Sequence, residues 1–184
     1  MERLNPAARS DRYGNRINRV ASPVRARTIP YVPILLGSLL PVLFLADVIP
    51  IFPPLGYLFF LSWRIMRPGL LPLWAGLPLG IFDDLFSGQP FGSAVLLWSV
   101  TMIILEVVEN RFPWRGFYQD WFTASLAIIA YIFAAMVVSG ANVTFQLALA
   151  VLPQVAIAIM LYPAVSRIVA GLDRFRLSRS RKIR

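Results

Sequence analysis

The 184-residue sequence contains no cysteine and no histidine. Without cysteine, the chain has neither a disulfide nor a thiol nucleophile. Without histidine, it lacks the commonest general base and the commonest metal ligand. Charged residues are also scarce, at 15% of the chain, against about 25% in soluble proteins. Enzyme classes that depend on cysteine or histidine are therefore excluded, and no cofactor or metal is expected.

Apolar side chains, in contrast, are abundant. Hydrophobic residues make up 58% of the chain, and the mean hydropathy is +0.66. The apolar residues occur in long stretches that few charges interrupt, which is the pattern of membrane-spanning helices. We therefore expect an all-α integral membrane protein.

The positive charge is concentrated at the two ends of the chain. Residues 1–28 contain seven arginines against two acids, and residues 167–184 contain seven cations against one acid. The net charge of the whole chain is +9. Because both basic ends flank apolar stretches, we expect them to bind anionic lipids rather than nucleic acid.

One membrane domain is predicted, over residues 29–168, between a disordered basic tail at 1–28 and a basic tail at 169–184. An amphipathic surface helix is the alternative for the first tail. Six apolar stretches are predicted to form one transmembrane bundle, at about 29–48, 54–66, 68–86, 91–108, 121–139 and 143–168. The second stretch is short against the roughly 20 residues that a bilayer requires, so a re-entrant segment is its alternative.

The number of crossings follows from the distribution of lysine and arginine. With six crossings, both ends lie on the cytoplasmic side, together with every lysine and arginine of the chain. The connecting segments on the other side, around 49–53, 87–90 and 140–142, then carry no cation. Five crossings would place the two basic ends on opposite sides of the membrane. We therefore expect six transmembrane helices with both termini in the cytoplasm.

A ladder of small residues runs along the third apolar stretch. Gly76, Gly80 and Asp84 are spaced by four residues and so share one face of a helix. Such a face lets a neighbouring helix approach closely and ends in a carboxylate. Packing within the chain is the simplest interpretation, and a contact between two copies is the alternative. Ala130 and Ala134 repeat the spacing in the fifth stretch.

Asp83 and Asp84 are predicted to lie near the outer face, because Asp84 follows Pro68 by about 24 Å of helix. Asp47 reaches the same level, and no lysine or arginine does. The carboxylates are then solvated, hydrogen-bonded to polar side chains of other helices, or paired with a partner's cation. Their simplest role is to cap the outer end of a helix and orient the turn at 87–90; a binding or conformational role, and a proton relay or catalytic pair, are the alternatives. Adjacent residues diverge by about 100° on a helix, which disfavours a catalytic pair.

On the cytoplasmic side, Glu106 and Glu109 lie one helical turn apart. We expect them to neutralise Arg111 and Arg115, and a docking site for a cytoplasmic partner is the alternative. Arg64 is expected to extend outward from the end of its short helix to the lipid headgroups. These charges would then determine the topology of the chain rather than take part in chemistry.

The glycine and acid positions of the third stretch resemble a family signature. The pattern Gly-x-x-x-Asp-Leu-x-Ser-Gly-x-x-Phe-Gly over residues 80–92, preceded by Gly76, is similar to that of the rod shape-determining protein MreD family. Hydropathy agrees over roughly 30–170, and Asp84 occupies the family's usual acidic position. The motif residues are Gly76, Gly80, Asp84, Ser87, Gly88 and Gly92.

The resemblance implies a non-enzymatic scaffold in the inner membrane of a bacterium, where it takes part in cell elongation. Its partners would be the single-span protein MreC, the glycosyltransferase RodA and a class B transpeptidase, and indirectly the MreB filament. The implied fold is similar to the six-helix substrate-binding subunits of energy-coupling-factor transporters. We expect the motif residues to hold the third and fourth helices so that a partner's transmembrane helix docks.

A second hypothesis is that the chain is itself a substrate-binding subunit of such a transporter, with a vitamin as substrate. This function requires an outer pocket with polar and aromatic walls. The candidate residues for its lining are Asp83, Asp84, Gln89, Trp98 and Asn142. An intramembrane enzyme is the weakest hypothesis, because the chain has no histidine, no cysteine and no acid–base pair on separate helices.

Overall fold

The computed structural model describes residues 27–43, 52–111, 116–140 and 144–177. These residues form helices and their connections, and no strand occurs among them. Several predictions concern residues outside the described ranges, namely residues 1–26 of the predicted tail at 1–28, Asp47, Arg115 and Asn142. The helices are α2 (Tyr31–Leu43), α3 (Leu55–Met66), η4 (Leu73–Ala75), α4 (Gly76–Phe86), α5 (Ser93–Arg111), α6 (Phe117–Val138) and α7 (Phe145–Leu177).

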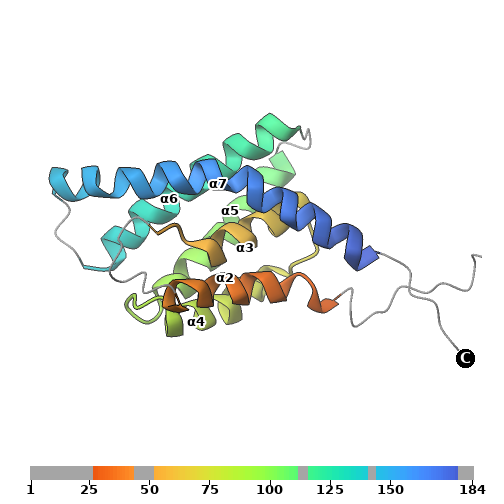
Figure 1. The fold of residues 1–184 in the computed structure, drawn as a ribbon, viewed down its shortest axis with the longest axis horizontal. Helices are drawn as coiled ribbons and strands as arrows, with labels where there is room; N and C mark the ends of the chain where they lie inside the picture. Colours follow the sequence, from red (N-terminus) through yellow and green to blue (C-terminus); the bar gives the residue numbers. More distant parts are fainter. Residues whose placement is uncertain (1–26, 44–51, 112–115, 141–143, 178–184) are drawn as a thin grey trace, which may run out of the picture.

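The helices are arranged in three layers (Figure 1). Helices α6 and α7 form one outer layer, α3 and α5 the middle layer, and α2 and α4 the other outer layer. Helix α3 contacts α2, α5, α6 and α7. It is the central helix of the fold, although it is only 12 residues long.

The burial of α3 explains its aromatic composition. Nine of its 12 residues are buried. The Tyr57 ring stacks on Tyr131 of α6 at 3.9 Å between ring centroids, and Phe60 stacks on Trp98 of α5 at 4.7 Å. Such contacts contribute about 1 kcal/mol each beyond the area that they bury. The short second stretch of the sequence is therefore the core of the bundle.

Successive helices run in alternating directions. Pro41, Leu55 and Asp83 line one cavity, and Met136 and Leu147 line a second one that adjoins it. Helices α2, α4 and α6 therefore end near these cavities, and α3 and α7 begin near them. We call this end of the bundle the cavity end.

The opposite end of the bundle carries arginine side chains, and we call it the arginine end. Arg64 lies at the last turn of α3, Arg67 directly follows that helix, and Arg176 lies at the last turn of α7. The ends of α3 and α7 are thus on the side opposite the cavities.

Within the described ranges, three helices are long and apolar enough to cross a membrane, namely α5, α6 and α7. Their outward faces carry large apolar side chains, among which Phe122 is 71% exposed and Met160 is 78% exposed. Exposed apolar surface of this extent is expected of helices that face lipid. Helices α2, α3 and α4 are shorter, with 13, 12 and 11 residues.

The third apolar stretch is not the continuous helix that the sequence predicts. Arg67 ends α3 with φ −132° and ψ 79°, as expected for a residue before Pro68. Pro72 is extended, with ψ 153°, and α4 begins only at Gly76. The 11 residues of α4 cover about 16 Å, so the predicted 24 Å of helix before Asp84 is wrong.

The last helix is longer than predicted. The sequence predicts that it ends at 168, whereas α7 continues to Leu177. Asp173 in the added segment is 4% exposed, and its carboxylate forms ion pairs with Arg67 and Arg176. The first half of the predicted basic tail is therefore part of the folded bundle.

Candidate functional site

The glycine ladder of α4 packs directly against the backbone of α5. A Cβ atom placed on Gly80 would lie 2.6 Å from Val95 Cα, and one placed on Gly76 would lie 2.9 Å from Ser99 Cα. Neither position has room for a side chain. The predicted close approach is confirmed, and the neighbouring helix belongs to the same chain. This face of α4 is therefore not available to a second copy.

Asp84 caps the start of α5. Its Oδ1 accepts a hydrogen bond from Ala94 N at 2.8 Å, and its Oδ2 accepts one from Gly92 N at 2.9 Å. Val95 N and Ser93 Oγ lie at 3.3 and 3.1 Å from the same carboxylate. The first backbone N–H groups of a helix have no partner within the helix and carry partial positive charge. The carboxylate thus satisfies them inside an apolar bundle, where water is scarce.

The loop between α4 and α5 has the shape that this cap requires. Ser87 ends α4, and its N–H bonds Asp83 O at 2.8 Å. Gly88 and Gly92 then adopt φ +66° and +96°, a region that other residues rarely occupy. These two glycines reverse the chain and bring the start of α5 onto Asp84. The motif residues at 84–92 thus form one capped turn, which includes the turn predicted at 87–90.

The prediction that Asp84 caps a helix end and orients the turn at 87–90 is confirmed, and the capped helix is α5 rather than α4. The partners of Asp84 are backbone N–H groups at the start of the next helix. The types of side chain in the sequence do not identify such partners. The neighbouring carboxylate has a different environment, as the angle between adjacent helical residues implies. Asp83 lines a cavity instead.

The cavity beside Asp83 has a volume of about 150 Å³ and is lined by Ser38 of α2, the start of α3 and the α4–α5 loop. An adjoining cavity of about 250 Å³ shares Gln89, Tyr131 and Gln154 with it. Asp83 and Gln89 were predicted to line an outer pocket, and both line the cavity of about 150 Å³.

Two other residues predicted for that pocket lie elsewhere. Asp84 is engaged by α5, and the Trp98 ring is fully buried against Phe60. Asn142 lies outside the described residues. Of the five candidates, two therefore line the cavity.

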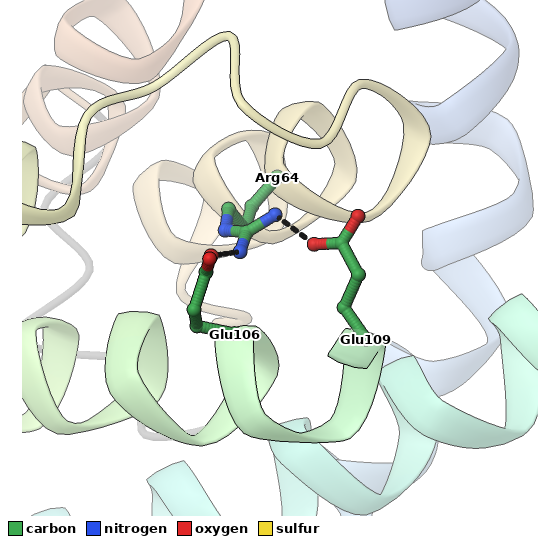
Figure 2. Close-up of polar contacts among 3 residues, drawn as sticks. All are labelled: Arg64, Glu106 and Glu109. Carbon is green, nitrogen blue, oxygen red and sulfur yellow. Dashed lines mark hydrogen bonds and ion pairs between the residues drawn. The ribbon is translucent and has the colours of Figure 1, made fainter. Parts of the chain in front are cut away.

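A buried charge cluster lies at the arginine end (Figure 2). Arg64 is 2% exposed, and its Nη1 donates to Glu109 Oε2 at 2.7 Å while its Nη2 bonds Glu106 Oε2. The predicted outward extension of Arg64 is therefore wrong. The sequence predicted Arg111 and Arg115 as the partners of the two glutamates and missed Arg64, which precedes them by more than 40 residues.

A second cluster joins the connection after α3 to the end of α7. Arg67 Nε donates to Asp173 Oδ2 at 2.8 Å, and Arg176 Nη2 lies 2.9 Å from Asp173 Oδ1. Sequence reasoning did not single out Asp173. The two clusters tie α3 to α5 and to α7 at the arginine end, so α3 is fixed at its C-terminus by charge.

An apolar groove of about 370 Å³ lies between α5 and α6. Helix α6 contributes small residues to its wall, including Ala127, Ala130 and Ala134. Helix α5 contributes Val100 and Ile104. Two of the three alanines were predicted to be a weak packing motif. They line this groove.

Comparison with known proteins finds no matching family model, no matching curated protein and no matching solved structure. Among the described residues, no group of three or more acidic, histidine or cysteine side chains is placed to hold a metal ion. The capped α4–α5 turn, the cavity beside Asp83 and the α5–α6 groove are therefore the features from which a function is inferred.

Proposed function

We propose that the protein is a non-enzymatic scaffold of the bacterial elongation complex, located in the inner membrane, that binds the transmembrane helix of MreC. The resemblance of residues 76–92 to the MreD family suggests this role. The observation that supports it is the position of the motif residues at the contact between α4 and α5. They fix α4 against α5 and cap α5 at its start. A scaffold requires a fixed helix on which a partner docks.

The α5–α6 groove is the proposed docking surface for that helix. Val95 and Ser99 of α5 face α4, whereas Val100 and Ile104 of the same helix line the groove. The motif therefore holds one face of α5 and leaves another face open. The alanines of α6 permit the close approach on which helix association in lipid depends. RodA and a class B transpeptidase would join through MreC, and the MreB filament indirectly.

The proposal includes six crossings with both termini in the cytoplasm. The alternating directions of the helices support it, since each element returns toward the end from which the previous one came. In this arrangement, the arginine end faces the cytoplasm and the cavity end faces outward. The basic chain ends would then bind anionic lipids of the inner leaflet.

Replacing Asp84 by alanine is expected to reduce the recovery of MreC. The start of α5 loses its cap, which costs about 1 kcal/mol or more, and the face of α5 in the groove is no longer held in place. We expect MreC to co-purify about fivefold less at equal membrane levels of the two proteins. Asp120→Ala removes an acid from another helix and serves as the control. Undiminished recovery with Asp84→Ala would exclude this role of the motif.

Filling the groove tests the docking surface separately. Ala130 lines the groove, whereas its neighbour Ile129 is a surface residue that does not. Ala130→Phe is expected to lower MreC recovery at least as much as Asp84→Ala, without lowering the melting temperature of the protein alone. Ile129→Phe is expected to leave recovery unchanged. Equal recovery with both variants would place the MreC contact on another surface.

A substrate-binding subunit of an energy-coupling-factor transporter is the second candidate function. The cavity beside Asp83, with Gln89 and Tyr131 in its walls, favours it. The two functions differ in the proteins that accompany the chain. Affinity purification from native membranes should recover MreC and RodA for the scaffold, and an ATPase module for the transporter subunit.

A further inference from the structure

The cavity beside Asp83 contains buried polar groups that the described residues leave without partners. Asp83 is only 8% exposed, and no cationic side chain of the described residues contacts its carboxylate. Ser38 is 2% exposed and lies beside it. The hydroxyl oxygen of Ser87, in the same wall, has no hydrogen-bond partner within the described part of the chain. Buried polar groups without partners are costly, so they indicate a missing ligand.

The oxygen atoms of the wall suit a cation with N–H donors. The carboxylate and the two hydroxyl groups are acceptors, and Gln89 and Gln154 add amide groups at the border with the adjoining cavity. The Gln154 amide is held in place because its Nε2 donates to Phe52 O at 2.9 Å. A divalent metal ion prefers several carboxylates, whereas Asp84 is already engaged by α5.

The cation that pairs with Asp83 has to come from a ligand, because the cavity end supplies no cationic side chain among the described residues. Arg64, Arg67 and Arg176 lie at the arginine end. The sequence segments at 44–51 and 141–143, which join α2 to α3 and α6 to α7, contain no lysine or arginine. A single buried carboxylate is stabilised by one positive charge that also forms hydrogen bonds.

We propose that this cavity binds a primary ammonium group, carried either by a small free amine or by the headgroup of a lipid such as phosphatidylethanolamine. The three N–H donors of the ammonium group meet the Asp83 carboxylate and neighbouring hydroxyl or amide oxygens. The proposal concerns the cavity alone. It does not depend on MreC binding, because the α5–α6 groove lies elsewhere.

The free-amine arm of the test uses the purified full chain in detergent. Ethanolamine, choline and sodium are added as chloride salts at equal ionic strength, and the melting temperature is measured. Ethanolamine is expected to raise it, because a ligand that binds the folded state stabilises that state. Choline carries the same charge without N–H donors on its nitrogen and is the matched control. Asp83→Asn is expected to weaken ethanolamine binding about tenfold or more.

The lipid arm uses nanodiscs with equal parts of phosphatidylethanolamine and phosphatidylglycerol, from which the protein is released for native mass spectrometry. Retained phosphatidylethanolamine is expected on the unaltered chain and on Asp120→Asn, and lost on Asp83→Asn. If Asp83→Asn does not fold, Ser38→Ala takes its place, with a smaller loss expected. Ethanolamine binding without lipid retention indicates a free amine as the ligand, and retention indicates the headgroup.

The proposal is overturned if neither arm shows binding, if choline or sodium stabilises the protein as much as ethanolamine, or if Asp83→Asn binds as well as the unaltered chain. Stabilisation by sodium alone would identify a metal-ion site instead. Each of these outcomes concerns Asp83 and leaves the MreC experiments unaffected.

Discussion

Gly80→Ala is expected to lower the free energy of unfolding by about 3 kcal/mol or more. The added methyl group would lie 2.6 Å from Val95 Cα and 2.7 Å from Val95 N. These are backbone atoms of a packed helix, so they cannot move aside as the end of a flexible side chain can. Helices α4 and α5 must separate, and the Asp84 cap is pulled from the start of α5. Unfolding in mixed micelles of a mild detergent and dodecyl sulfate measures the effect.

Gly171→Ala is the matched control for this variant. Gly171 lies in α7, and a Cβ atom placed on it meets no atom within 4 Å. The substitution is expected to leave stability unchanged or to raise it by up to about 1 kcal/mol, the difference in helix propensity between the two residues. If Gly80→Ala were as stable as Gly171→Ala, the close contact between α4 and α5 would be refuted.

The second large effect concerns the buried charge cluster of Arg64, Glu106 and Glu109, in which the arginine is more deeply buried than the two glutamates. The Arg64 side chain is 2% exposed, whereas Glu106 is 43% exposed and Glu109 is 22% exposed. Removing both negative charges with Glu106→Gln and Glu109→Gln leaves a buried guanidinium without a counter-charge. We expect a loss of about 3–5 kcal/mol. Arg64→Met is expected to cost less, because water reaches the two glutamates. The same unfolding assay gives both values.

The triple variant of Arg64→Met, Glu106→Gln and Glu109→Gln separates charge from shape. It restores most of the stability lost in the double variant, because the buried charge is gone and the methionine fills its place. A triple variant no more stable than the double variant would show that the cluster acts by shape rather than by charge. If Arg64→Met lowered the free energy of unfolding more than the double variant does, the argument from the deeper burial of Arg64 would be contradicted.

The sequence was sufficient for much of the fold. Helical spacing placed Gly76, Gly80 and Asp84 on one face, and that face packs closely, as predicted. Hydropathy located the short α3 to within one residue, whereas it placed the start of α4 and the end of α7 wrongly. Pro68 and Pro72 carried the signal for the break before α4, but the apolar run between them concealed it.

The contacts that the sequence did not reveal are long-range or made by backbone atoms. Arg64 and Glu106 meet across two intervening connections, and no spacing rule joins them. Asp84 bonds N–H groups, which every residue but proline has, so residue type gives no indication of this partner. For the same reason the diverging roles of Asp83 and Asp84 follow only from the packing of α5 and α2 around them.

The pairing of Arg64 has a consequence for the order in which the chain assembles during synthesis. The ribosome delivers Arg64 well before Glu106 and Glu109, so α3 emerges with a cation that has no counter-charge. The α4–α5 hairpin, in contrast, closes over only eight to eleven residues through Asp84. Because local contacts close at a lower entropy cost than distant ones, we expect the hairpin to form first. We expect α3 to pack in the centre of the bundle only when α5 brings both glutamates to it, late in assembly although it is made early.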